Sequence, residues 1–165
     1  MKARLGWMAA VGAVGLLLAA CLPVSGGGYI SGVNGGKANF GFSVACDSSS
    51  HLTGAWNYND KGAGVNIAGD MSSVNQGCPD GSPGRQSYAS TYTAQGKCRA
   101  NCTGFARIDI FDGGGRGSLK GDCLDVILFN GVFDGYSNFD PSGTECSGDP
   151  LGGLKPVLGG NLTVG

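Results

Sequence analysis

Residues 36–46 read GKANFGFSVAC, and apolar side chains occupy every second position along this stretch. The apolar positions that share one parity are Ala38, Phe40, Phe42 and Val44. Because successive side chains of a β-strand point to opposite faces of its sheet, this alternation predicts a strand with one face in a core. The clearest structural signal in the sequence is therefore that of a β-strand.

Other segments extend this pattern over most of the chain. Strands are predicted at 104–112, 123–130, 87–94 and 160–164, and weaker patterns predict strands at 28–32, 52–59 and 64–69. Large side chains stand at both parities in 104–112, which indicates burial on both faces of that strand. No window keeps the spacing of an amphipathic helix, and turn residues recur between the strands. We therefore expect an all-β fold, an antiparallel sandwich or barrel of about seven to nine strands.

Composition limits the classes of protein that the chain can belong to. Its 165 residues suit one domain, and its 11 basic and 12 acidic residues form no run of a single sign. The 33 glycines separate short alternating segments, as expected for frequent turns between strands. Because the sequence contains no basic patch, we expect no nucleic-acid partner.

The first 20 residues have the layout of a secretory signal. Lys2 and Arg4 precede an uncharged, mostly apolar stretch at 5–20. This stretch is shorter than the roughly 20 apolar residues that a membrane-spanning helix needs, and Pro23 follows it closely. The pattern therefore favours a cleaved leader over a retained transmembrane anchor.

Cys21 follows Leu-Ala-Ala at 18–20, and this sequence resembles a bacterial lipobox. The resemblance implies that the Cys21 thiol carries diacylglycerol, with fatty-acyl chains such as palmitate, and that the leader is cut just before it. The protein would then lie in the cell envelope, anchored to a membrane by lipid and facing the periplasm or the exterior. This divides the chain into a lipoprotein signal peptide (1–20), the acylated cysteine with a tether (21–28) and a single all-β domain (29–165).

Six cysteines remain once Cys21 is assigned to lipid: Cys46, Cys78, Cys98, Cys102, Cys123 and Cys146. An even number of cysteines in an oxidising compartment predicts three disulfides. A zinc site is the alternative, but no second closely spaced pair or histidine cluster completes a ligand set around Cys98 and Cys102. We expect Cys123 to pair with Cys146, and the other two pairings stay open.

Five segments in order resemble the small secreted bacterial module found after choice-of-anchor domains, the post-COAP type. They are GGGYI (26–30), GKANFGF (36–42), GFARIDIFD (104–112), DVILFNG (125–131) and GGNLTV (159–164). The resemblance implies an all-β extracellular module and brings no settled activity or catalytic residues. The six cysteines and the lipobox depart from that family's pattern.

Aspartates around a glycine-rich stretch provide a candidate calcium site. The candidate ligands are Asp109, Asp112, Asp122 and Asp125. Calcium takes six to eight hard oxygen ligands, and glycine allows a backbone to bend and offer its carbonyls. The alternative is a solvated hairpin turn, since acidic residues are common in turns. Calcium is the one cofactor that the sequence suggests.

Aromatic residues in the segment 54–60 provide a second candidate site. Trp56 and Tyr58 could stack on sugar rings, although core packing explains large aromatics equally well. A hydrolase built on paired aspartates is a weaker alternative, and the single histidine, His51, is expected to face solvent at the start of a strand. The sequence therefore favours a non-enzymatic envelope module, binding or structural, with an envelope protein or a glycan as its partner.

Overall fold

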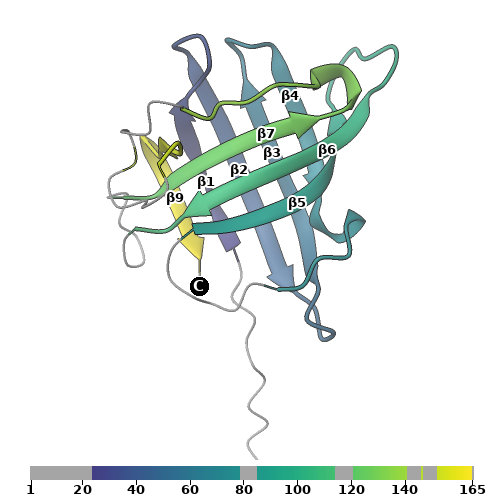
Figure 1. Cartoon of the computed structure of the whole chain (residues 1–165), viewed down its shortest axis with the longest axis vertical. Coiled ribbons are helices and arrows are strands. Elements are labelled where there is room, and N and C mark those ends of the chain that lie inside the picture. The colour runs from purple at the N-terminus through teal and green to yellow at the C-terminus, as the bar shows by residue number, and fades with distance from the viewer. Residues whose placement is uncertain (1–23, 79–84, 114–120, 141–145, 147–151, 165) are drawn as a thin grey trace, which may run out of the picture.

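The structure of the chain is a computed structural model that describes residues 24–78, 85–113, 121–140, 146 and 152–164. Within these residues the fold is all-β, as the sequence predicts. Figure 1 shows the strands β1 (Val24–Ser31), β2 (Lys37–Cys46), β3 (Leu52–Asp60), β4 (Val65–Asp70), β5 (Arg85–Ala94), β6 (Thr103–Phe111), β7 (Cys123–Phe129), β8 (Lys155–Pro156) and β9 (Gly159–Val164). Two 3-10 helices, η1 (Met71–Ser73) and η2 (Gly131–Phe133), lie between them. None of the helices described is long and apolar enough to span a membrane.

The strands form one antiparallel sheet that curls back on itself. Its strand order is β8-β7-β6-β5-β4-β3-β2-β1-β9, so each of the first seven strands pairs with the next one along the chain. Strands β5, β6 and β7 cross in front of β1 to β4 (Figure 1), and the two halves of the sheet enclose the interior. This curled arrangement agrees with the predicted sandwich or barrel.

The predicted strands are all present, and their limits differ at one end of the chain. β1 begins at Val24, where it pairs with Val44, so 24–28 belong to the sheet and not to the expected tether. The predicted signal peptide (1–20) and Cys21 lie outside the described residues. Strand β8 was not predicted, because two residues, one of them Pro156, show no alternation.

The C-terminal segment joins the two edges of the curl. After β8 has paired with β7, the Val157 N–H donates to the Asp122 carbonyl over 2.8 Å. The Leu158 N–H then donates to the Tyr29 carbonyl of β1 over 2.9 Å. In β9, Gly160 has a φ of 110°, and a Cβ at this position would lie 2.0 Å from a β1 carbonyl oxygen. Closure therefore depends on a residue without a side chain.

Alternating side chains of the strands fill the interior. The four apolar residues of β2 that share one parity are all buried, as the opening pattern predicts. The Trp56 and Phe42 rings stack with centroids 6.3 Å apart, and the Trp56 indole donates to the Ser90 hydroxyl over 2.8 Å. A buried indole N–H without a partner would cost stability, so Ser90 makes this position suitable for tryptophan.

Three disulfides cross-link the described chain, as predicted: Cys46–Cys78, Cys98–Cys102 and Cys123–Cys146. The expected pairing of Cys123 with Cys146 is confirmed. On the outer face of β6 and β7, this pair forms a second apolar cluster with Phe111 and Leu154. The cluster covers the outer face of β6 at its Phe111 end, whereas Phe105 and Arg107 at the other end of that face stay exposed.

Candidate functional site

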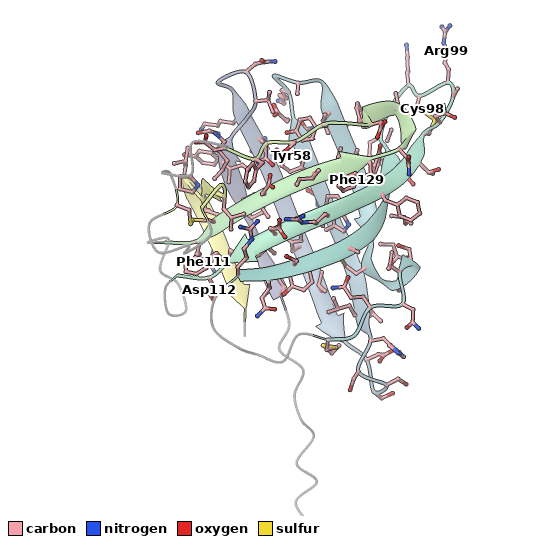
Figure 2. The ribbon with its side chains drawn as sticks, viewed as in Figure 1. Tyr58, Cys98, Arg99, Phe111, Asp112 and Phe129 are labelled. Carbon is pink, nitrogen blue, oxygen red and sulfur yellow. A yellow bond between two sulfur atoms is a disulfide. The ribbon has the colours of Figure 1, made fainter. Side chains whose placement is uncertain are left out.

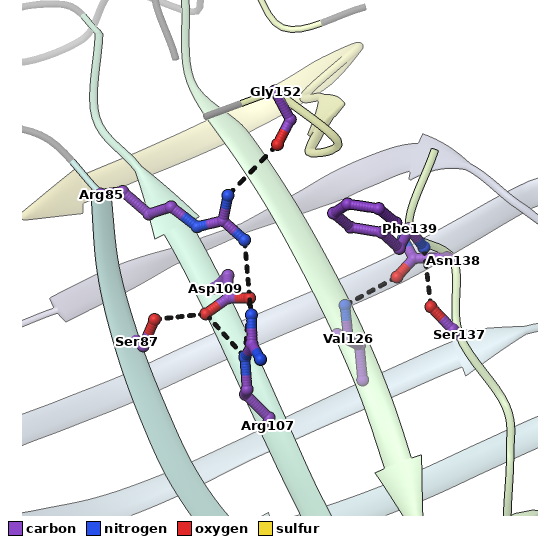
Figure 3. A network of polar contacts seen from close by, with 9 residues as sticks. All are labelled: Arg85, Ser87, Arg107, Asp109, Val126, Ser137, Asn138, Phe139 and Gly152. Carbon is purple, nitrogen blue, oxygen red and sulfur yellow. Dashed lines mark hydrogen bonds and ion pairs between the residues drawn. The ribbon is translucent and has the colours of Figure 1, made fainter. Parts of the chain in front are cut away.

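The buried carboxylate of Asp109 is the centre of a polar network on β5 and β6 (Figure 3). Arg107 Nη2 and Arg85 Nη2 lie 2.6 and 2.9 Å from Asp109 Oδ2. The Ser87 hydroxyl donates to Asp109 Oδ1, and Arg85 donates to the Gly152 carbonyl over 3.2 Å. Burial acts to raise the pKa of Asp109, but the hydrogen bonds from the two arginines and the serine outweigh it and hold that pKa below its ordinary value.

Asp125 of β7 lies directly opposite Asp109 in the strand register and is equally buried. Neither carboxylate oxygen of Asp125 accepts a hydrogen bond of normal geometry from the described residues. The side chain of Asn138 accepts from the Val126 N–H over 2.6 Å, while its own Nδ2 is buried and has no hydrogen-bond partner among the described residues. Burial, followed by repulsion from the Asp109 carboxylate, raises the pKa of Asp125 to about 7.

These two carboxylates bear on the paired-aspartate hydrolase considered from the sequence. Both side chains are fully buried, and two arginines already bind Asp109. A glycosidase needs two acids that face each other across a cleft open to the substrate. Within the described residues Asp109 and Asp125 are closed off from solvent, and the hydrogen bonds of Asp109 hold β5 and β6 together instead.

Asp112 and Asp122, the other two predicted calcium ligands, lie just beyond the ends of β6 and β7. Burial, with a smaller contribution from the Asp112 carboxylate, raises the pKa of Asp122 to about 6. The four aspartates thus fall into two pairs, one within the strands and one beyond them. In the part of the chain that the structure describes, no group of three or more histidine, cysteine or acidic residues could hold a metal ion. The glycine-rich residues 114–120 between the two pairs, whose carbonyls the predicted calcium site would use, lie outside the described residues, so the calcium site stays a prediction.

Trp56 and Tyr58 point into the core, so the prediction that they stack on sugars is wrong. Their side chains are 2% and 1% exposed, and the core-packing alternative is what the structure shows. The reason is the period of two in β3, which places both residues on its inner face. The Tyr58 hydroxyl lies 2.7 Å from that of Tyr136, which donates to buried Asp60 over 2.9 Å.

Phe105 and Phe129 form an exposed aromatic pair that the sequence analysis did not single out. They lie directly opposite each other in β6 and β7, and they are 52% and 44% exposed. Figure 2 shows Phe129 on the β7 ribbon, well away from the Phe111 end of the sheet. Phe105 lies on the same face of β6 as exposed Arg107, opposite to the face of Ala106 and Ile108, and Phe129 pairs with it across the strands; this alternation was the available signal.

A hollow of about 390 Å³ lies over the outer face of β2 to β4. The small residues Gly41, Ser43, Ala55 and Ala68 line much of it, with Asn57 beside them. None of its lining side chains is ionisable, so the hollow supplies hydrogen-bonding groups without acid–base chemistry.

His51 is exposed at the start of β3, as predicted. Its Nδ1 lies 4.0 Å from Asp47 Oδ2, and its backbone N–H donates to Asp47 Oδ1 over 2.9 Å. These contacts order the turn between β2 and β3, which is a structural role.

No protein-family model, curated protein or solved structure matches this chain. Inference about its function therefore starts from its own residues and their geometry.

Proposed function

We propose that this chain is an exported bacterial lipoprotein, anchored to a membrane of the cell envelope through Cys21, whose β-domain acts as a binding or structural module. One observation carries the proposal, and it is the use of the seven cysteines. Three disulfides take up six of them, and the seventh, Cys21, follows Leu-Ala-Ala. Disulfides persist in oxidising, extracytoplasmic compartments, which is where a lipobox directs a chain.

The start of β1 bears on how the domain would sit on its membrane. Two residues, Leu22 and Pro23, separate Cys21 from Val24, the first residue of β1. A chain of that length spans at most about 11 Å. Each buried CH₂ of an acyl chain contributes about 0.8 kcal/mol, so two or three chains give a stable anchor. We propose that this short link holds the Val24 end of the sheet at the membrane surface.

The test follows the lipid and the cysteines in one experiment. The full-length gene is expressed in bacteria with labelled palmitate, and the mature protein is analysed by mass spectrometry. We expect an acylated N-terminal peptide that begins at Cys21, and no label in a Cys21→Ala variant. A Cys98→Ala/Cys102→Ala variant is the matched control, because it removes two cysteines and keeps the lipobox. An uncut leader, or a mature chain without acyl mass, would contradict the proposal.

A second candidate function is glycan binding on the Phe105–Phe129 pair. Two neighbouring aromatic rings on an exposed sheet face offer apolar surface to the faces of sugar rings. Arg107, two residues from Phe105 on the same face of β6, is half-exposed and brings a guanidinium group to this face of the sheet. In this proposal Phe105 and Phe129 contact the sugar, in place of Trp56 and Tyr58, which are buried.

A glycan array with the purified mature domain tests this second candidate. Binding that is lost in Phe105→Ala and in Phe129→Ala would support it, and both variants should stay folded because the rings are exposed. Val33→Ala is the matched control, since Val33 is also exposed at 48% but follows β1 in another part of the sheet. An array without signal for the parent protein would remove glycan binding from consideration.

A further inference from the structure

The loop between β5 and β6 carries a disulfide that differs from the other two in its surroundings. Residues 95–102 read QGKCRANC, and Cys98 and Cys102 bond to each other across this loop. Cys98 and Arg99 lie at the tip of the hairpin, beyond the end of the sheet (Figure 2). All the other residues of the loop are exposed, and the two cysteines are half-buried.

The other two disulfides contact the apolar clusters, although Cys46 and Cys78 are themselves half-buried. Cys123 and Cys146 are 0% and 5% exposed and belong to the outer apolar cluster. Cys46 and Cys78 pack against the main core. The described apolar clusters include neither Cys98 nor Cys102, so a thiol reagent can approach this bond without opening a core.

The length of the closed loop also distinguishes the Cys98–Cys102 disulfide from the other two. The cysteines of the Cys98–Cys102 bond are 4 residues apart, whereas those of the other pairs are 32 and 23 apart. The stabilisation that a disulfide gives by restricting the unfolded chain grows with the loop it closes. Opening the shortest loop therefore costs the fold least.

The local charge favours a thiolate at Cys98. Lys97 and Arg99 flank this cysteine directly, and the segment 95–102 contains no acidic residue. Neighbouring cations lower the pKa of a thiol, and a thiol of lower pKa leaves faster in thiol–disulfide exchange. Cys98 is thus the sulfur better suited to leave when the bond is attacked.

We propose that Cys98–Cys102 is an exchange-active disulfide that accepts electrons from a dithiol partner, while the other two disulfides stay closed. A thiolate of the dithiol attacks the Cys102 Sγ, a mixed disulfide forms, and Cys98 leaves as a thiolate. The second thiol of the partner then loses its proton and attacks the partner's own sulfur in the mixed disulfide. Cys102 is released, both cysteines end as thiols, and the partner is oxidised to a disulfide by two electrons.

The test measures the order in which the three bonds open. The mature protein is held at neutral pH in buffers of reduced and oxidised dithiothreitol, quenched with acid, alkylated and digested for mass spectrometry. We expect Cys98 and Cys102 to be alkylated at a reduced-to-oxidised ratio about tenfold lower than the other cysteines require. The fluorescence of Trp56 should not change at that ratio, because the core stays packed. Simultaneous opening of all three bonds, or earlier opening of either other pair, would overturn the proposal.

A charge variant tests the leaving group separately. In Lys97→Gln/Arg99→Gln the two cations are absent and the loop keeps its length. We expect its first reduction step to be about threefold slower. Lys37→Gln/Lys61→Gln is the matched control, because it removes two exposed cations of other loops and strands and should react at the parent rate. An unchanged rate in the first variant would refute the role given to the cations.

Discussion

Replacing Asp125 by asparagine should stabilise the protein at alkaline pH, although substitutions of fully buried side chains usually destabilise a fold. The carboxylate lies against that of Asp109, and no described group donates a hydrogen bond of normal geometry to it. Asparagine has nearly the same shape and carries no charge. Burial and the Asp109 carboxylate disfavour the charge of Asp125 more than its neighbours favour it, so the substitution removes a destabilising buried charge and keeps the packing.

The size of the effect follows from the pKa of Asp125, which is raised from 3.8 to about 7. A raised pKa means that the folded protein binds the proton more tightly than the unfolded chain does. The resulting stabilisation is complete below about pH 4 and is lost as the pH rises to about 7, which amounts to roughly 4 kcal/mol. A buried amide without partners costs about 1 to 3 kcal/mol, so the expected net gain for Asp125→Asn at pH 8 is about 2 kcal/mol.

Urea unfolding of the mature domain, followed by the fluorescence of Trp56, measures this difference at pH 4, 6 and 8. We expect the stabilisation by Asp125→Asn to shrink as the pH falls and to turn into a destabilisation of about 1 to 3 kcal/mol near pH 4, where the parent side chain is protonated and only the cost of the buried amide remains. Asp47→Asn is the control, because its effect on stability should depend on pH in the opposite direction. The backbone hydrogen bond from His51 is the largest effect that lowers the pKa of Asp47, so this carboxylate stabilises the fold at high pH and the effect is lost as the pH falls. A stability difference for Asp125→Asn that stays constant with pH would show that the reasoning is wrong.

Three further predictions concern the stability of the fold and use the same unfolding assay. Cys123→Ala/Cys146→Ala should lower the free energy of unfolding by about 3 kcal/mol, because it opens a long loop and loosens the outer cluster; a loss below about 1 kcal/mol would contradict this. Gly160→Ala should destabilise by about 2 kcal/mol or more, because its φ is 110° and its Cβ would clash with the β1 backbone. Gly35→Ala is the control: its φ is also positive, at 77°, but its Cβ meets nothing within 4 Å, so it measures the backbone strain without the clash. Trp56→Phe should lower the free energy of unfolding by about 1 to 3 kcal/mol, because the Ser90 hydroxyl loses its indole donor and the smaller ring leaves a void. Circular dichroism follows the unfolding of this variant, and an unchanged urea midpoint would argue against the buried position of Trp56.

The alternation in residues 36–46 was enough to predict β2 and its inward face, because the period of two is a local property of an extended backbone. The same reasoning found the other main strands and indicated burial on both faces of β6, which holds only for its second half, since Phe105 and Arg107 are exposed. It did not find β8, whose two residues are held by contacts with β7 and not by a pattern of their own. It also placed the start of the domain after Gly28, because the glycines of β1 read as a tether until β2 and β9 pair on either side of them.

The candidate sites were harder to predict than the strands. The sequence brought Asp109 and Asp125 together as members of one acidic set, and the structure does pair them. Two arginines that bind Asp109 were not foreseen as its partners, since Arg85 comes from another strand and its position depends on the register of β5 with β6. Trp56 was considered for an exposed role because composition alone does not say which face of a strand is inside.

The sequence by itself determined the β-strands, the even number of cysteines left after Cys21 and the sparse, balanced charge, all of which are properties of neighbouring residues or of composition. Only the tertiary structure decided which aromatic rings are buried, which aspartates meet, and which disulfide stands apart from the core. These properties depend on strand register and on the curl that brings β8 and β9 together at the edges of one sheet. Register and closure arise from contacts between residues far apart in the chain, and a local pattern carries no information about them.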